Sequence, residues 1–212
     1  MLPDSSSIKR KEVPTMEQEP MDNQEQGYEA KEEAVTPKIY VASLSDYNDG
    51  RLFGRWIDAD QTPQELYAVV KSMLEASPMP YAEEWGIFDY EGFGPLRIDE
   101  YESFETVSLL AHGIAEHGEA FAHWVDLTGE RDEDVVTNFQ SSYLGCFESI
   151  EAYAESLLED LGYKDMIQPP LPEFLQPYVS IDIESLARDL ELSGDVMTAE
   201  GGGGVYVFSS TW

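Results

Sequence analysis

The amino-acid sequence predicts an α+β protein in which small domains of helices and antiparallel strands follow a disordered tail. Three observations lead to this fold class. Runs rich in β-branched and aromatic residues flank turn signals, apolar stripes recur at helical spacing, and the N-terminal tail lacks apolar periodicity. The chain has 212 residues with four Trp, twelve Tyr and nine Phe, so it can bury a sizeable core in one to three domains.

The tail, residues 1–37, is predicted to be disordered and acidic. It holds four prolines, three consecutive serines and many Glu and Gln residues. It contains nine acids and four bases, which leaves 34 acids and eight bases, a net charge of −26, in residues 38–212. The charge excess of the chain is therefore a property of its predicted folded part.

The first predicted domain, residues 38–101, has the element order β-β-α-β. The segment "KIYVASLSDYNDGRLFGRWID" holds two strand-like runs around a turn signal at residues 48–50. A helix follows in "TPQELYAVVKSML", where a threonine cap, a proline at the first helical position and Glu65 form a capping box. A third strand is expected from about residue 85 to residue 90.

A helical middle domain, residues 102–137, is predicted next, with one helix before Gly118 and a second short helix after it. The third predicted domain, residues 138–212, is α+β. It contains a helix in "SIEAYAESLLEDLG", a helix in "IDIESLARDLELSG" and a terminal hairpin around the glycine run at residues 201–204.

The helix predicted in "SIEAYAESLLEDLG", from Ser149 to Gly162, carries an unusual row of like charges. Glu151, Glu155 and Glu159 recur every fourth residue, roughly 6 Å apart along the helix, with no Lys or Arg between them. Such pairs destabilise a helix by a few tenths of a kcal/mol each. The row is therefore a candidate functional surface. The opposite, apolar face comprises Ile150, Tyr153, Ala154, Leu157 and Leu161.

The composition indicates a basic protein as partner. The chain has 43 Asp and Glu against 12 Lys and Arg, a net charge of −31 that far exceeds what solubility requires. Such a field repels nucleic acid and anionic membranes and attracts basic surfaces. The single cysteine, Cys146, excludes an internal disulfide and favours a reducing compartment. Without a run of eighteen apolar residues or a signal-peptide core, we expect a cytoplasmic protein.

Familiar catalytic and metal-binding patterns do not fit the sequence. The acidic turn "SDYNDGRLFGRW" places Trp56 where a calcium loop needs a bidentate Glu, and the three histidines are spaced by five and six residues, unlike a zinc motif. Cys146 lacks a nearby basic residue and is expected in the core. The glycine run precedes Val205 rather than Lys-Ser. We expect no enzyme activity, metal or cofactor, although the many carboxylates leave an acid–base enzyme open.

The candidate binding residues are carboxylates that occur in clusters along the predicted folded part. One cluster alone is typical of a solvated face or a helix N-terminus, but the lack of neutralising bases in every segment favours a shared function. The candidates are Glu83, Glu84, Asp89, Glu91, Asp99, Glu100, Glu102, Asp132, Glu133, Asp134, Glu148, Glu151, Glu155, Glu159, Asp182, Glu184, Asp189 and Glu191.

Several segments, taken in order, resemble the ArdA antirestriction family over essentially all of residues 38–212. They are "IYVASLSDYNDGRLFGRWID", "FDYEGF", "IDEYESFE", "FESIEAYAESLLEDLG" and "RDLELSG". The resemblance implies an elongated, acidic homodimer encoded on a mobile element, which imitates B-form DNA and occupies the DNA groove of type I restriction-modification enzymes. The family's antirestriction motif corresponds to roughly residues 148–162, which implies that the glutamate row there replaces phosphates. The apolar face of that helix is open to a subunit contact.

The charge density agrees with such a role. Duplex DNA carries about one charge per 1.7 Å of axis, so a net charge of −26 matches roughly 44 Å of duplex, and a dimer matches roughly 88 Å, or about 26 base pairs. Two alternatives remain. An acidic chaperone or scaffold for a basic protein needs no long, defined shape, which small-angle scattering would reveal. An enzyme adapted to high salt would lose its structure at low ionic strength.

Overall fold

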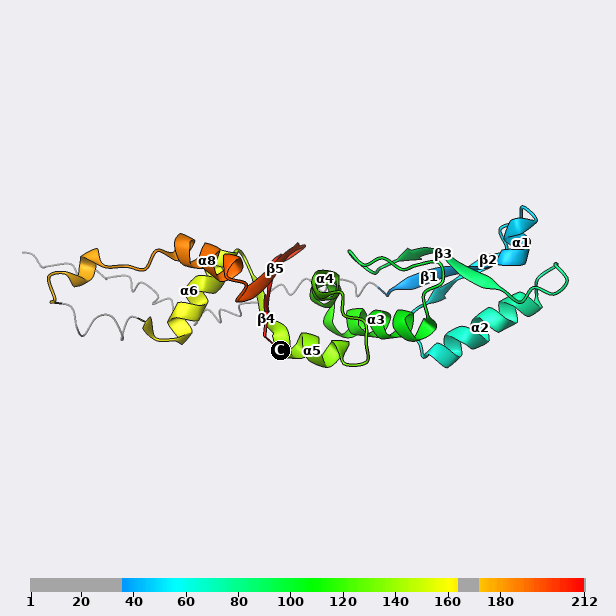
Figure 1. The fold of residues 1–212 in the computed structure, drawn as a ribbon, viewed down its shortest axis with the longest axis horizontal. Coiled ribbons are helices and arrows are strands. Elements are labelled where there is room, and N and C mark those ends of the chain that lie inside the picture. Colours follow the sequence, from blue (N-terminus) through cyan, green and yellow to red (C-terminus); the bar gives the residue numbers. More distant parts are fainter. Residues whose placement is uncertain (1–35, 164–171, 212) are drawn as a thin grey trace, which may run out of the picture. The chain divides into compact units, whose positions relative to one another are not determined.

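The structure is a computed structural model that describes residues 36–163 and 172–211 (Figure 1). Within these residues it contains seven α-helices, a short 3₁₀ helix and two three-stranded antiparallel sheets. The predicted mixture of helices and antiparallel strands is confirmed. The division into three domains stays a prediction, and the predicted tail lies almost wholly outside the described residues.

The first sheet has the order β2-β1-β3. The central strand β1 (Lys38–Ser43) pairs antiparallel with both β2 (Gly54–Asp58) and β3 (Trp85–Glu91). A short helix α1 (Leu44–Asn48), which the sequence did not predict, lies between β1 and β2. The two predicted strands therefore form and pair, but a helical turn connects them. Its first turn is capped by the Ser43 hydroxyl, which accepts a hydrogen bond from the Asp46 amide at 3.3 Å.

Helix α2 (Pro63–Glu75) lies between β2 and β3 in the sequence, and α3 (Phe104–His117) and α4 (Glu119–Thr128) follow β3. The predicted capping box at the start of α2 is confirmed, because the Thr62 amide donates to Glu65 Oε2 at 2.9 Å and the Glu65 amide donates to Thr62 Oγ1 at 3.4 Å. Helix α2 packs against β2 and α3, and the buried residues of α2 and α3 share a common core with those of the sheet.

This core continues across the predicted limit between residues 137 and 138. Helix α5 (Val135–Ser142) spans that limit. Its Phe139 is 3% exposed and lies 6.0 Å from the Trp124 ring and 6.3 Å from the Phe208 ring, between centroids. A single cluster of buried residues thus extends from Ile39 to Phe208.

The second sheet has the order β4-β6-β5. Strands β5 (Val196–Gly201) and β6 (Gly204–Ser209) form the predicted terminal hairpin, whereas β4 (Tyr143–Phe147) was not predicted. A Cβ at Gly204 would lie 2.2 Å from the Phe147 carbonyl oxygen, so no side chain fits there. The expectation that Cys146 is a core residue is wrong: on the edge strand β4 its side chain is exposed.

The remaining helices are α6 (Ile150–Asp160), the 3₁₀ helix η1 (Gln176–Tyr178) and α8 (Ile183–Leu192). Helices α6 and α8 pack against each other, and α6 also contacts β4 and β6. None of the helices in residues 36–163 and 172–211 has the length and apolar character needed to cross a membrane.

Candidate partner-binding carboxylates

Helix α6 presents the predicted glutamate row to solvent. Ser149 caps the helix, as predicted, by accepting a hydrogen bond from the Ala152 amide at 3.2 Å. Glu151, Glu155 and Glu159 are all exposed. With four residues between neighbours, their Cα atoms are about 6 Å apart along the helix axis. The row is therefore available to a partner.

The apolar face of α6 differs in part from the prediction. The buried residues are Ala154 and Leu158, while Leu161 is 55% exposed. Leu161 is the C-cap rather than a residue of the last turn, and the following Gly162 takes a φ of +64°, so the chain leaves the helical path at this point. A side chain beyond the last helical turn no longer follows the spacing that placed it on the buried face.

Local hydrogen bonds favour the charged form of Glu151. The Ser149 side chain and the backbone amide of Glu151 itself both lower the pKa of the Glu151 carboxyl from its ordinary value. Glu151 also lies in the first turn, where the helix dipole favours a negative charge. Farther along the helix, Glu155 and Glu159 line a cavity of about 320 Å³ to which Ile181 and Ile183 also contribute.

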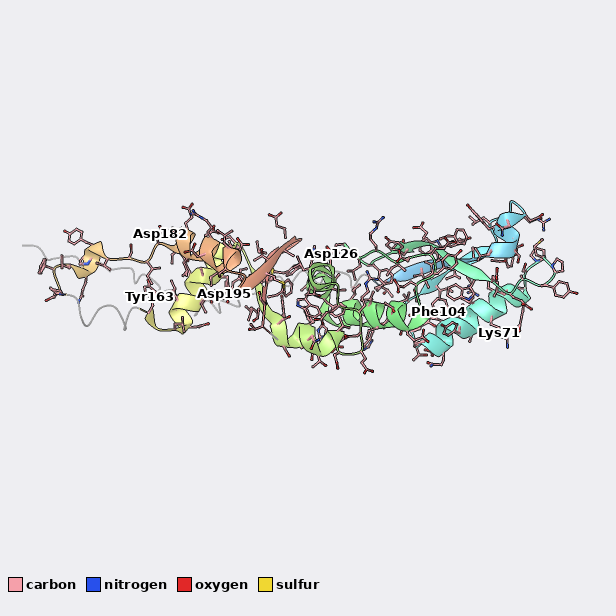
Figure 2. The ribbon with its side chains drawn as sticks, in the orientation of Figure 1. Lys71, Phe104, Asp126, Tyr163, Asp182 and Asp195 are labelled. Atoms are coloured by element: carbon pink, nitrogen blue, oxygen red, sulfur yellow. The ribbon has the colours of Figure 1, made fainter. Side chains whose placement is uncertain are left out.

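The acidic candidates at the start of α8 and within it are exposed, and several of them also form local hydrogen bonds or an ion pair. Asp182, at the start of α8 (Figure 2), accepts hydrogen bonds from the Ser185 amide at 3.1 Å and the Ser185 hydroxyl at 2.8 Å, which lower the pKa of its carboxyl. Glu184 lies 3.8 Å from Arg188, and Glu191 accepts a hydrogen bond from the Thr198 hydroxyl at 2.6 Å. A weak, exposed contact of this kind does not prevent partner binding.

Glu102 is the exception among the eighteen candidates. The other seventeen residues are exposed, whereas Glu102 is half-buried and forms an ion pair with Arg131 at 3.1 Å. Arg131 also donates to the Arg97 carbonyl at 3.0 Å, so it connects the segment before α3 with the segment between α4 and α5. Glu102 therefore serves the fold, and no local pattern in the sequence indicates this pairing across 29 residues.

The described residues hold far more carboxylates than bases. Residues 36–163 and 172–211 contain 33 Asp and Glu but seven Lys and Arg. Five of these bases already form ion pairs with Glu91, Asp49, Glu75, Glu102 and Glu184. Even if each of these bases neutralises one acid, this part of the chain keeps an excess of 26 carboxylates over Lys and Arg. Most of this charge therefore faces water or an external partner.

Comparison with known families decides what kind of protein carries this surface. A family model described as antirestriction protein (ArdA) matches residues 39–204. The chain belongs to the ArdA antirestriction family. This match confirms the resemblance seen in the sequence and suggests an antirestriction function, which implies interaction with restriction enzymes in general. No curated protein matches the chain.

The match to the ArdA family extends from β1 to the first residue of β6. It therefore includes all of α6 and α8, with the glutamate row and the acidic candidates on both helices. ArdA is a family of antirestriction proteins and is not known as a family of enzymes. Among the described residues, no group of three or more His, Cys, Asp or Glu is arranged to hold a metal ion.

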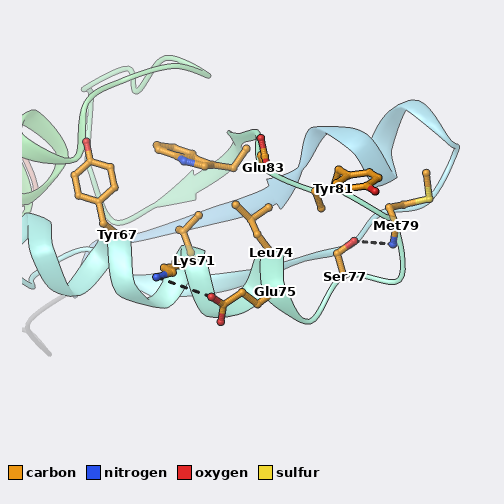
Figure 3. Close-up of a pocket in the computed structure, with 11 residues that line it drawn as sticks. Tyr67, Lys71, Leu74, Glu75, Ser77, Met79, Tyr81 and Glu83 are labelled. Carbon is orange, nitrogen blue, oxygen red and sulfur yellow. Dashed lines mark hydrogen bonds and ion pairs between the residues drawn. The ribbon is translucent and has the colours of Figure 1, made fainter.

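One site on this ArdA-family chain was not predicted. A cavity of about 690 Å³ lies between the C-terminal half of α2 and the segment that leads to β3 (Figure 3). Aromatic rings of Tyr67, Tyr81 and Trp85 line it. The segment "SPMPYAEEW", with two prolines and two aromatic residues directly after a well-capped helix, was the available signal.

Proposed function

We propose that this chain inhibits type I restriction-modification enzymes by imitating B-form DNA. In this proposal its carboxylates occupy the enzyme's basic DNA-binding groove in place of phosphates and block cleavage of incoming DNA. The observation that carries the proposal is the exposure of seventeen of the eighteen candidate carboxylates in a chain of the ArdA family. The proposed setting is the cytoplasm of a cell that receives a mobile element.

The electrostatics support this function over other uses of an acidic surface. A groove that binds duplex DNA presents Lys and Arg at the density of the phosphates, and a partner gains most when its own charge density is similar. The net charge of −26 over residues 38–212 is equivalent to roughly 44 Å of duplex. Because the carboxylates belong to a folded polypeptide, the chain offers neither a phosphodiester bond to cleave nor a base to methylate.

We further propose that the inhibitor is a homodimer. A two-fold dimer presents the same acidic surface twice, with the charge of roughly 88 Å of duplex. Large apolar side chains that lack cover are numerous toward the C-terminus: Leu161, Phe174, Leu175, Tyr178, Val179 and Leu192 are each at least 38% exposed. Burial of such side chains is the usual driving force for a subunit interface.

The experiment that tests the function is an ATP-dependent cleavage assay with purified type I enzymes of several specificities. We expect the protein to block cleavage at near-stoichiometric amounts and to bind no duplex DNA itself. Methylation by the same enzymes is measured in parallel, because both activities need the DNA groove. Unimpaired cleavage by every enzyme in the presence of excess protein would overturn the proposal.

A further inference from the structure

The aromatic cavity beside α2 has the chemistry of a site for a positively charged side chain. Trp85 stacks with one face of its indole on the buried ring of Phe104, at 4.3 Å between centroids and 12° between planes. Its other face is thus left to the cavity that it lines. Tyr67 lies 6.5 Å from Trp85 between centroids, and its hydroxyl donates to Glu105 Oε2 at 3.3 Å, so the ring is held in place.

Tyr81 completes the aromatic wall from the opposite side (Figure 3). Its side chain is 91% exposed, and its φ of +63° is a conformation that bulky residues rarely adopt. The segment is ordered around it, because the Met79 amide donates to Ser77 Oγ at 3.0 Å and the Ser77 hydroxyl donates to the buried carboxylate of Asp46. Strained residues of this kind concentrate where a protein contacts a ligand.

The charges around the cavity favour a cation. Glu75 on α2 and Glu83 on the following segment both line it. The cavity also lies at the C-terminal end of α2, where the helix dipole is negative and the last turn contains no basic residue. Lys71 carries the opposing charge and lies 4.0 Å from Glu75, so these two charges largely offset each other and Glu83 leaves the lining with a net charge of −1.

We propose that this cavity binds an arginine side chain presented by a protein partner. The guanidinium group stacks on the faces of Trp85 and Tyr81 and lies near Glu75 and Glu83, while the methylene groups pack on Val70 and Leu74. Arginine fits better than lysine because its planar, weakly hydrated group stacks on aromatic rings. The assignment of the arginine to the restriction enzyme rests on the proposed function. The proposal that the cavity binds an arginine side chain does not depend on that function.

This contact differs in kind from a carboxylate that replaces a phosphate. A phosphate surrogate acts through charge alone and is weakened by salt, whereas an aromatic site adds an apolar, salt-resistant contribution. The cavity volume also lies within the usual range of about 300 to 1,000 Å³ for ligand pockets, so a side chain and part of its backbone can enter. The cavity would thus anchor one arginine within a larger electrostatic contact.

The first test uses N-acetyl-arginine methylamide as a probe, with NMR detection on the full-length protein. We expect saturable shifts confined to the Trp85 indole N–H and the amides of residues 77–85. The uncharged citrulline analogue, which has the same shape, should cause none. Tyr81→Ala should weaken probe binding about two- to fivefold, the loss of one exposed cation–π contact. The matched control is Tyr101→Ala, because Tyr101 is 71% exposed and lies outside the cavity lining.

Lys71→Gln tests whether the cavity prefers a positively charged group. It removes the competing positive charge and should tighten binding of the arginine probe. Equal binding of the citrulline analogue, shifts spread over the whole surface, or unchanged affinity in Tyr81→Ala would each overturn the proposal.

A second readout separates this site from the proposed function. Tyr81→Ala should inhibit a type I enzyme about two- to fivefold less well than Tyr101→Ala. If the variant loses the probe but inhibits as well as its control, the cavity does not contact the enzyme and the partner assignment is wrong. If the parent protein inhibits no type I enzyme, the proposed function fails, and the probe titration still decides whether the cavity binds arginine.

Discussion

Reversing the charge of the glutamate row on α6 should weaken partner binding and leave the stability of the protein nearly unchanged. Changing Glu151, Glu155 and Glu159 to Lys alters the net charge by +6 per chain on a surface that is exposed throughout. If each carboxylate contributes about 0.5 kcal/mol to partner binding and each new lysine repels as strongly, affinity falls by about 3 kcal/mol, or about a hundredfold. Single changes to Gln should have little effect, because each exposed contact is weak.

The stability of α6 should change much less. Three lysines at the same helical spacing repel one another as the three glutamates do, so this repulsion is unchanged. The variant loses the first-turn acid Glu151 and gains a positive charge at position 159 in the last turn, and these two effects on the helix dipole oppose each other. Thermal unfolding and dimerisation are measured first, because a broken dimer would look like a lost contact. The assay is then displacement of duplex DNA from a purified type I methyltransferase.

A matched control distinguishes the row from net charge. Asp126 (Figure 2), Glu173 and Glu200 are exposed, lie outside the candidate set, and give the same +6 when changed to Lys. We expect this control to compete with DNA far better than the α6 variant. Should the α6 variant stay folded and dimeric and yet compete as well as the parent, the glutamate row is a solvated face and its role as a phosphate surrogate is refuted.

Three further predictions concern the tail, the core and the acid limit of stability. Removing residues 1–35 should leave thermal unfolding and inhibition nearly unchanged, because Pro37 still accepts the Ala59 amide hydrogen bond at 2.8 Å; a tenfold or greater loss of inhibition would contradict this. Gly113→Ala should destabilise the protein by about 1–3 kcal/mol in chemical denaturation, since a Cβ there would lie 2.4 Å from the Phe121 ring; an unchanged midpoint would show that the core relaxes. The capping box lowers the pKa of the Glu65 carboxyl below its ordinary value of 4.5. The stabilisation of the folded state by Glu65 is therefore present above pH 4.5 and is lost as pH falls through the folded-state pKa. Glu65→Gln should therefore reduce the fall of Tm at low pH. A Tm–pH profile that runs parallel to that of the parent protein would contradict this prediction.

Elements with local signals could be predicted from the sequence. The start of α2 follows from a capping box and the start of α6 from Ser149, because both depend on residues within one helical turn. The five-residue strand β4 depends instead on pairing with β6, which places Tyr143 opposite Phe208. Helix α1 is equally short, and Asp46 within it accepts a hydrogen bond from Ser77. Contacts between residues so far apart leave no local pattern.

The same distinction applies to the candidate sites. Exposure of the carboxylates could be predicted, because an unpaired charge is costly to bury. The pairing of Glu102 with Arg131 could not be predicted, and neither could the cavity, which needs α2, the Tyr81 segment and Trp85 to be placed together. Sequence thus predicted the chemical character of the surface, whereas the structure was needed to separate residues that serve the fold from those that face a partner.

The most direct measurement of the central claim is a binding competition on one purified type I methyltransferase. The enzyme is titrated with labelled duplex DNA at several fixed concentrations of this protein. If the protein occupies the DNA groove, the apparent Kd for DNA rises in proportion to its concentration, no ternary complex forms, and the competition weakens as salt is raised. A complex that contains enzyme, DNA and this protein together, with unchanged affinity for DNA, would contradict the account.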